Sequence, residues 1–236
     1  MTDEGAREQA VGHLRRLAAE GVWALRTPAS IATGAPSVPA PGADREDVAT
    51  VAMTLDEVAA ASSGCELCKL SEHRTNVVFG VGDPAARIMF IGEGPGRDED
   101  LQGEQFVGAA GQLLNKILAA MGLAREDVYI ANTVKCRPPN NRNPEPDELM
   151  ACRPYLLQQV ELIKPEVIVV LGRVAMQAVL NTDAALGRMR GRLHDWNGIP
   201  IVCTYHPAYL LRTPEDKGKT WDDMQLVMQH LGLAQR

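Results

Sequence analysis

The sequence predicts an α/β protein, a three-layer αβα sandwich around a central four-stranded parallel sheet. Four short apolar segments recur along the chain, and helix-like segments separate them. The strand-like segments span 86–92, 127–134, 166–171 and 199–205. The helix-like segments span 108–121, 146–163, 173–181 and 219–232. Alternation of helices with strands that are apolar on both faces is typical of a parallel sheet covered by helices.

The composition supports a globular core with an appendage. The chain has 236 residues, of which 45% are hydrophobic, enough for one good-sized core. No apolar run is long enough to span a membrane, and no signal pattern opens the chain, so we expect a cytoplasmic protein without membrane attachment. The net charge of -6 argues against a purely electrostatic nucleic-acid binder.

The N-terminal quarter differs from the rest of the chain. Apolar residues recur at helical spacing near the N-terminus and predict one amphipathic helix within 1–26. Residues 27–50 are rich in proline and alanine and are typical of a disordered linker. The remainder, 51–236, forms the expected domain. It opens with a capping box, Thr54-Leu-Asp-Glu57, which predicts the start of a short helix.

Two residues punctuate the predicted helices. Gly122 follows the segment at 108–121 and suits a left-handed helix end. Pro154 lies inside the segment at 146–163 and is expected to break or kink it just after Cys152.

The strand at 86–92 runs directly into a glycine-rich, acidic loop. This loop reads Gly92-Glu-Gly-Pro-Gly96. Ligands of open parallel sheets bind beyond the carboxyl ends of the strands, and the second and fourth strands end near Asn132 and His206. A composite site is therefore expected at this edge. A phosphate-binding P-loop is not, because no Lys-Ser/Thr pair follows and no helix is expected directly after Gly96.

Five cysteines in a reducing compartment indicate metal or redox chemistry before disulfides. Cys65 and Cys68 form one close pair, whereas fifteen residues separate Cys136 from Cys152. This spacing leaves a zinc site and an iron–sulfur cluster equally open. Cys203, in the middle of a strand, is expected to be a buried, inert thiol.

Several motifs in sequence order carry a family resemblance. They are GEGPGRDED, then Phe106-Val-Gly108, then NTVKCRPPNNRNP, then HPAYLLR. Over about residues 64–230 the chain resembles the family 4 uracil-DNA glycosylases, iron–sulfur enzymes of base-excision repair. The resemblance implies a uracil-DNA glycosylase catalytic domain at 51–236 that takes a [4Fe-4S] cluster. The implied ligands are Cys65, Cys68, Cys136 and Cys152, and the implied role of the cluster is structural.

The resemblance assigns the reaction to two catalytic residues. Glu93 would position or activate water and face the positive charge on the sugar, and His206 would donate a hydrogen bond to uracil O2 as the base leaves. Phe106 would stack on uracil. Asn132 would read its O4 and N3–H edge, which cytosine lacks.

The remaining implied contacts surround the base and the DNA. Gly94, Pro95 and Gly96 would keep the loop tight and close to the substrate, and Glu99 would lie near the pocket entrance, paired with Asn141. The neighbouring Asp98 and Asp100 are expected to be solvated. The implied DNA contacts are Leu210 or Leu211 as a wedge into the duplex, with Arg212 touching phosphate. Independently of the resemblance, Arg190 lies in a small basic loop between Gly187 and Gly191 that suits a phosphate contact.

The leading hypothesis is a monofunctional enzyme that acts on uracil in single- or double-stranded DNA. No lysine stands in the site motifs to form a Schiff base; Lys135 is expected to face the cluster or DNA. Two alternatives are a glycosylase for other deaminated bases and a non-catalytic iron–sulfur DNA-binding or redox-sensing module. A relative that traps uracil-DNA covalently is disfavoured, because its basic insertion is absent. A monomer is expected, and a sliding clamp stays open as a partner.

Overall fold

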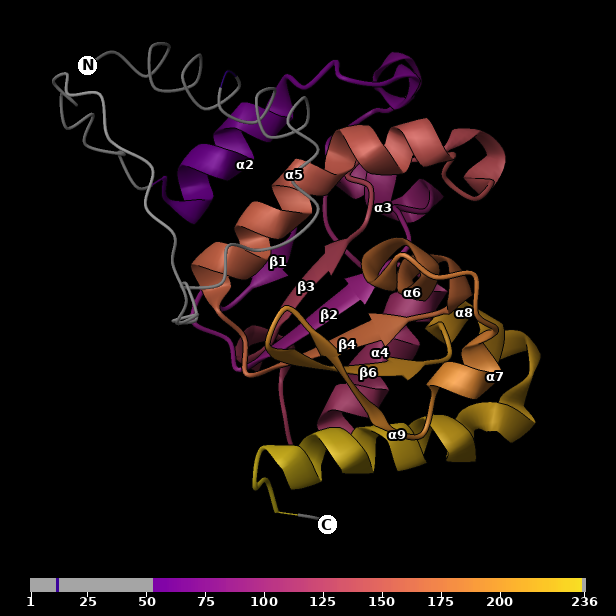
Figure 1. Cartoon of the computed structure of the whole chain (residues 1–236). Coiled ribbons are helices and arrows are strands. Elements are labelled where there is room, and N and C mark those ends of the chain that lie inside the picture. The colour runs from indigo at the N-terminus through magenta and orange to yellow at the C-terminus, as the bar shows by residue number, and fades with distance from the viewer. Residues whose placement is uncertain (1–11, 13–52, 235–236) are drawn as a thin grey trace, which may run out of the picture.

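The computed structural model describes residue 12 and residues 53–234 of the chain (Figure 1). The helix predicted within 1–26 and the linker predicted at 27–50 lie outside the described residues, apart from Gly12. None of the helices in the described part is both long enough and apolar enough to cross a membrane.

One sheet forms the centre of the molecule, with strand order β1-β3-β2-β4-β6-β5. Its four inner strands run parallel, which confirms the predicted parallel core. They are β3 (Tyr129–Asn132), β2 (Ile88–Gly92), β4 (Val167–Leu171) and β6 (Ile199–Thr204). Two antiparallel edge strands, β1 (Val81–Gly82) and β5 (Leu193–Trp196), extend the sheet beyond the prediction. Neither strand was predicted, because the prediction relied on buried apolar segments, whereas β1 has only two residues and β5 is largely exposed.

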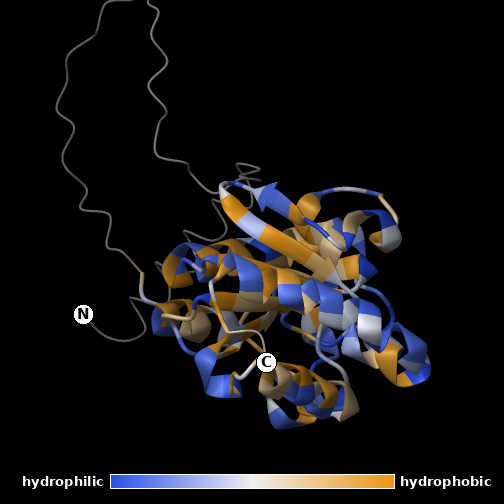
Figure 2. Ribbon diagram, turned by 90° about the horizontal axis from the view of Figure 1, so that it is seen from below, coloured by the Kyte–Doolittle hydropathy of each residue, from blue (hydrophilic) through white to orange (hydrophobic). Residues whose placement is uncertain are grey.

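Alternate side chains of the parallel strands enter two separate cores. Met89 and Ile91 of β2 pack with α5 (Pro146–Ile163) and α6 (Arg173–Leu180) on one face. Ile88 and Phe90 pack with α4 and α9 on the other face. These two helices span Ala109–Ala120 and Lys217–His230. The result is the predicted αβα sandwich (Figure 1), in which hydrophobic and hydrophilic residues alternate along the outer helices (Figure 2).

A third apolar cluster lies between α2 (Leu55–Ser63) and α5 and includes all four cysteines of the predicted metal site. The capping box that starts α2 forms as predicted, with the Thr54 and Glu57 side chains each accepting from the other residue's backbone amide. This cluster connects the segment before the sheet to the segment after β3.

The break predicted at Pro154 does not occur, because α5 runs without interruption from Pro146 to Ile163. Proline inside a helix costs about 3 kcal/mol. The residues after Pro154, including Tyr155, Leu156 and Val160, are buried, and their packing offsets that cost. Gly122 follows α4 with a φ of +79°, which confirms the predicted left-handed helix end.

Short helices occupy the loops at the carboxyl edge of the sheet. They are α3 (Arg97–Gln102), the 3-10 turn Pro139–Asn141, α7 (Leu186–Met189) and α8 (Pro207–Arg212). Helix α3 begins directly after Gly96, so the expectation that no helix follows this glycine is wrong. Glu99 explains the helix, since its carboxylate accepts from the Gly96 backbone amide and completes the first turn.

Candidate active site

A cavity of about 410 Å³ lies at the carboxyl edge of the sheet. It is lined from the ends of β2, β3 and β6, and by the turn before α4. The predicted site residues in its wall are Glu93, Gly94, Pro95, Gly96, Glu99, Phe106, Asn132, Asn141, His206 and Arg212. Of the predicted substrate and DNA contacts, Leu210, Leu211 and Arg190 lie outside it. The fold therefore brings both predicted catalytic residues and both predicted base-reading residues to one place.

Glu93 stands at the end of β2, in a loop that is tied to β3. Its backbone carbonyl accepts from the Thr133 hydroxyl at 2.5 Å and from the Val134 amide at 3.2 Å. Burial raises the pKa of the Glu93 carboxyl, and the nearby Arg173 guanidinium acts in the opposite direction. Since β4 pairs with β2, Arg173 at the start of α6, two residues after the end of β4, lies close enough to act on Glu93.

Glu99 joins two segments of the cavity wall. Its carboxylate accepts from the backbone amides of Gly96, Val107 and Gly108 at 3.0–3.1 Å. The predicted pairing with Asn141 does not form: the Glu99 oxygens accept from backbone amides, and the Asn141 side chain accepts from Arg137 through its Oδ1. Glu99 satisfies backbone donors that a short helix leaves open, and so fixes the position of the Phe106 turn.

The acidic run around Glu99 divides into two kinds of residue. Asp98 is exposed, as predicted. Asp100 is only 2% exposed, which corrects the prediction of a solvated side chain. Its carboxylate accepts from the backbone amides of Thr75 and Asn76, because a buried carboxylate needs such partners.

Phe106 adopts a left-handed backbone conformation, with a φ of +51°. Such a conformation is rare for a bulky residue and persists where surrounding contacts impose it. Arg125 supplies them by donating to the backbone carbonyls of Gln105 and Phe106. The ring stacks on His206 with centroids 5.6 Å apart and planes 30° apart, so the two rings form one side of the cavity.

Asn132 is held by a residue that the sequence reasoning missed. Its side-chain nitrogen donates to Gln105 Oε1 at 2.5 Å, while its Oδ1 is buried without a hydrogen-bond partner among the described residues. A Cβ atom on Gly92 would lie 2.3 Å from that oxygen and 2.8 Å from the Phe106 ring. Gly92 therefore makes room for both side chains. Neither Gln105 nor Gly92 carries a sequence signal beyond its position beside a predicted site residue.

His206 caps the N-terminus of α8. Its Nδ1 accepts from the Ala208 backbone amide at 3.1 Å, which leaves the proton of the neutral ring on Nε2. Burial, with a smaller contribution from Arg212, lowers the pKa of His206 to about 4, although Glu99 acts in the opposite direction. At neutral pH His206 is therefore an uncharged donor through Nε2, while its other nitrogen is committed to the helix.

The segment after His206 is a helix rather than an open loop, and its two leucines differ. Leu210 is 1% exposed and belongs to the core, whereas Leu211 is 45% exposed. The side chain of Leu210 is thus excluded as a wedge, which leaves Leu211. Arg212 lines the cavity.

Arg190 is already committed within the protein. Its guanidinium pairs with the buried carboxylate of Asp223, with nitrogen–oxygen distances of 3.1 and 3.2 Å, and lies 5.5 Å from the centre of the Tyr205 ring. The pairing gives Arg190 a role inside the protein, as the cation of the buried Asp223 carboxylate, and its phosphate contact stays a prediction.

The four predicted ligand cysteines, Cys65, Cys68, Cys136 and Cys152, line one small pocket. Two donors point at their sulfurs: Arg74 Nη1 lies 3.4 Å from Cys136 Sγ, and the Lys135 amide lies 3.2 Å from Cys152 Sγ. Burial raises the pKa of the Cys152 thiol to about 12. Within residues 53–234, no group of three or more His, Cys, Asp or Glu side chains is arranged to hold a single metal ion.

The donor set of this pocket fits an iron–sulfur cluster. Thiolates are the ligands that such clusters take, and hydrogen bonds to their sulfurs are a common feature of these sites. Cys203 lies apart from this pocket, in β6, and is fully buried, as predicted.

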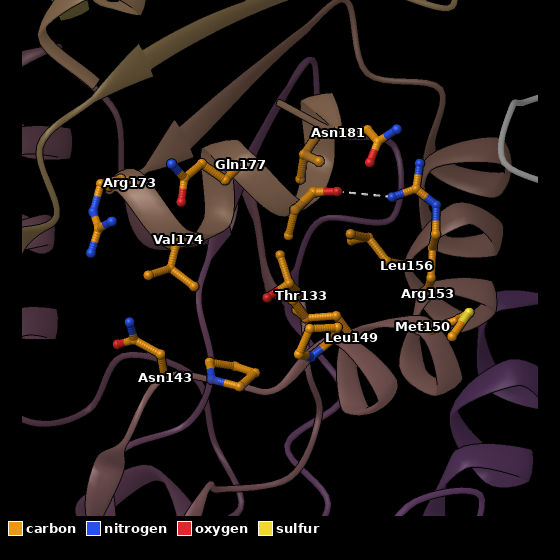
Figure 3. A pocket seen from close by; sticks show the side chains of 14 residues that line it. Thr133, Asn143, Leu149, Met150, Arg153, Leu156, Arg173, Val174, Gln177 and Asn181 are labelled. Atoms are coloured by element: carbon orange, nitrogen blue, oxygen red, sulfur yellow. Dashed lines mark hydrogen bonds between the residues drawn. The ribbon is translucent and has the colours of Figure 1, made fainter. Parts of the chain in front are cut away.

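A second cavity of about 430 Å³ lies between α5, α6 and the segment 143–146. Arg173 and Asn143 lie at one end of it, and Met150 and Arg153 at the other (Figure 3). It contains none of the predicted site residues, but Asn143 lines both cavities. Arg173, which acts on the Glu93 carboxyl, therefore reaches the first site from this side.

Comparison with known proteins gives one consistent result. The model of the uracil DNA glycosylase superfamily matches residues 79–225. A type-4 uracil-DNA glycosylase from Archaeoglobus fulgidus is 44% identical over 190 residues, which cover 77% of this chain and 96% of the relative. The type-4 enzyme of Saccharolobus solfataricus is 44% identical over 75% of this chain and 86% of its own. The type-4 enzyme of Thermotoga maritima is 50% identical over 63% of this chain and 78% of its own.

Proposed function

The chain belongs to the type-4 uracil-DNA glycosylases of the uracil DNA glycosylase superfamily, and on that premise we propose how its cavity releases uracil from DNA. It hydrolyses the N-glycosidic bond of deoxyuridine and leaves an abasic site in base-excision repair. One observation carries this proposal: Glu93, Phe106, Asn132 and His206 line a single cavity, although they come from distant parts of the chain.

Glu93 serves the sugar side of the reaction. When the bond between C1′ and N1 breaks, its electron pair moves to uracil and positive charge develops on the deoxyribose. An ionised Glu93 stabilises that positive charge electrostatically, and its carboxylate accepts a proton from the water that adds to C1′. Arg173 favours the ionised carboxylate against the effect of burial.

His206 serves the leaving base. Its Nε2–H donates to uracil O2, where negative charge accumulates, and the ring stays neutral because its pKa is about 4. The hydrogen bond from Ala208 to Nδ1 sets this tautomer. Phe106, stacked beside His206, provides a face for the uracil ring.

Asn132 selects the base. Its free Oδ1 accepts from the N3–H of uracil, and cytosine offers no hydrogen there. An unpaired buried oxygen facing the N3 lone pair of cytosine would be costly, and this kind of rejection is strong. The orientation imposed by Gln105 keeps this acceptor directed at the base.

The uracil must leave the duplex to enter the cavity. Leu211, exposed beside the cavity on α8, fills the vacated stack, and Arg212 contacts a phosphate. The substrate is uracil-containing DNA, single- or double-stranded. A cytoplasmic location and a monomeric state stay predictions.

The cofactor is a [4Fe-4S] cluster held by Cys65, Cys68, Cys136 and Cys152. When bound, it supplies a fixed crosslink rather than a step of the reaction. The positions of the four cysteines show which segments this crosslink would join. The first pair precedes the sheet, and Cys136 and Cys152 flank the segment that contributes Pro138, Asn141 and Asn143 to the cavity wall.

The enzyme is monofunctional. Lys135 lies beside the cysteine pocket and is only 2% exposed, and no lysine is among the residues that line the catalytic cavity. A Schiff base with the sugar would require one. The non-catalytic alternative predicts a broken site and has no support from this arrangement.

The direct test uses oligonucleotides that contain one uracil, either single-stranded or paired with guanine or adenine, followed by alkali cleavage of abasic sites. The iron-replete protein should cleave them, and Glu93→Gln should lose at least about 100-fold in kcat. Asp98→Asn is the matched control, because this exposed carboxylate is outside the cavity. Absence of cleavage by the iron-replete wild-type protein would refute the proposed function.

The cofactor has its own test. Protein purified without oxygen should be brown and contain iron and sulfide, and each Cys→Ser substitution at the four positions should lower both contents. Cys203→Ser is the control, since this thiol is in β6 and outside the pocket. A colourless protein that contains zinc would refute the cluster.

A further inference from the structure

Lys135 is a buried cation that pairs with neutral oxygens. Its side chain is among the largest fully buried ones in the described part of the chain. The ammonium donates to the Asn132 carbonyl at 2.9 Å and to Gln159 Oε1, and it lies 5.7 Å from the centre of the Phe79 ring. No carboxylate forms an ion pair with it within residues 53–234. A buried charge without an opposite charge is very costly.

The negative charge that Lys135 lacks is available in the cysteine pocket. Lys135 lines that pocket together with the four cysteines, and its own backbone amide donates to Cys152 Sγ at 3.2 Å. Arg74 lines the same pocket, donates to Cys136 Sγ and likewise forms no ion pair with a carboxylate in the described region. Two cations thus border a pocket whose four thiols become thiolates when they bind iron.

Lys135 also belongs to a closed ring of hydrogen bonds that contains the base-reading residue. Its ammonium donates to the Asn132 carbonyl at 2.9 Å, and Asn132 Nδ2 donates to Gln105 Oε1 at 2.5 Å. Gln105 Nε2 donates to the Val78 carbonyl at 2.9 Å, and the Val78 amide donates back to the Lys135 carbonyl at 2.8 Å. The same residue therefore lines the cysteine pocket and holds the backbone of the residue whose side chain reads uracil.

We propose that Lys135 is a positioning residue that links the two sites: its ammonium balances the negative charge of the cluster-bound thiolates and holds the Asn132 turn in its reading conformation. This inference rests on the proposed function. It adds that the cluster stabilises uracil recognition through one buried lysine, and that the lysine in turn stabilises the cluster. Asn132 is placed correctly only when the buried charge of Lys135 is compensated.

Two substitutions separate the charge from the hydrogen bond. Lys135→Met has a similar length and removes both, whereas Lys135→Gln removes the charge and keeps a donor for the Asn132 carbonyl. Lys135→Arg keeps the charge and serves as the rescue variant. Lys116→Met is the matched control, because Lys116 is exposed on α4, on the opposite face of the sheet.

The cluster is measured first, without reference to activity. Iron and sulfide per protein, the rate of cluster loss to a chelator and the reduction potential are compared in anaerobically purified proteins. Lys135→Met and Lys135→Gln should lose the cluster about tenfold faster than wild type, in keeping with the usual effect of a ligand's supporting partners. Both should have a more negative reduction potential, because a removed positive charge disfavours the added electron. Lys135→Arg and Lys116→Met should resemble wild type.

Uracil release is then measured on the iron-replete fraction of each protein. Lys135→Met should raise KM or lower kcat about tenfold, and Lys135→Gln should recover most of that loss while keeping the altered potential. A structural role alone would not shift the potential in both neutral variants and restore it in Lys135→Arg. Wild-type retention and potential in Lys135→Met would overturn the inference.

Variants that fail to fold also test the proposed role of Lys135. If Lys135→Met does not fold, Lys135→Gln carries the comparison. A set in which only the arginine variant folds would support a need for charge, and failure of all three would count against it. A wild-type protein that releases no uracil, or contains no iron, would refute the proposed function instead, so the two failures are distinguishable.

Discussion

Gln105 orients Asn132: its Oε1 accepts from Asn132 Nδ2 at 2.5 Å and leaves Asn132 Oδ1 buried without a partner. A buried polar atom without a partner costs about 1–3 kcal/mol, and such atoms concentrate where a ligand completes the hydrogen bonding. The pair therefore keeps Asn132 Oδ1 available as an acceptor for a donor on the substrate. In uracil that donor is N3–H.

The first prediction concerns the Asn132 side chain, which offers that acceptor together with a donor. Asn132→Asp should reduce kcat/KM for uracil release by at least about 100-fold, because a carboxylate offers no donor to uracil O4 and repels the developing anion. Single-turnover kinetics on single-stranded DNA would measure it. Asn197→Asp, in the turn between β5 and β6, is the control, and unaltered kinetics in Asn132→Asp would remove Asn132 from the recognition role.

The second prediction concerns the orienting residue. Gln105→Leu should lower kcat/KM about tenfold, or about 1.4 kcal/mol, because the Asn132 amide can then rotate. It should also destabilise the fold by about 1–3 kcal/mol, since the Val78 carbonyl loses its donor. Urea unfolding and kinetics on the same sample separate the two effects. Gln112→Leu, exposed on α4, should change neither, and full activity in Gln105→Leu would contradict the orienting role.

The third prediction concerns the donor at uracil O2. His206→Leu should lower kcat by about 10²–10³-fold, the usual cost of removing a donor to a developing oxyanion, whereas His206→Gln, which keeps a donor, should lose less. Because the pKa of His206 is about 4, its protonation should not limit the wild-type rate between pH 5 and 8. His230→Gln, exposed at the end of α9, is the control. Equal rates in the leucine and glutamine variants would argue against donation.

The fourth prediction concerns pH. Burial raises the pKa of Glu93 and Arg173 lowers it, so Arg173→Gln should raise it further. Glu93 acts as a carboxylate, so the fall in kcat on the acid side should begin at a higher pH in Arg173→Gln, and the two rates should converge at alkaline pH. Rates at saturating DNA from pH 5 to 9 test this. Arg173→Lys should restore the profile and Arg188→Gln should not alter it; an unshifted acid limb in Arg173→Gln would exclude the electrostatic effect.

The fifth prediction separates the two leucines of α8. Leu211→Ala should slow uracil release from duplex DNA several-fold and leave single-stranded DNA unaffected, because only a duplex has a stack to fill. Leu210→Ala should instead destabilise the protein by about 2–5 kcal/mol through a cavity in the core, without a preference between the two substrates. Equal effects of Leu211→Ala on both substrates would reject the wedge.

The sequence by itself determined the architecture and most of the cavity wall. Buried parallel strands are recognisable in a sequence as short apolar segments. Their carboxyl ends lie at one edge of the sheet, so Glu93, Asn132 and His206 meet there independently of the loop conformations. The edge strand β5 was not predicted, because it is largely exposed and its local pattern differs little from that of a loop. The uninterrupted α5 was missed for a related reason: the penalty at Pro154 is local, but the packing that outweighs it is not.

Only the tertiary structure decided the partners of the site residues. Gln105 and Asn132 are 27 positions apart, Arg190 and Asp223 are 33 apart, and nothing in either local sequence records the other. The same holds for Leu210 and Leu211, which are adjacent in sequence but differ in burial because helix α8 turns one inward and the other outward. Residue type and spacing predict the local chemistry of the site, whereas the hydrogen-bond partners and the exposure of its side chains depend on contacts that exist only after the chain has folded.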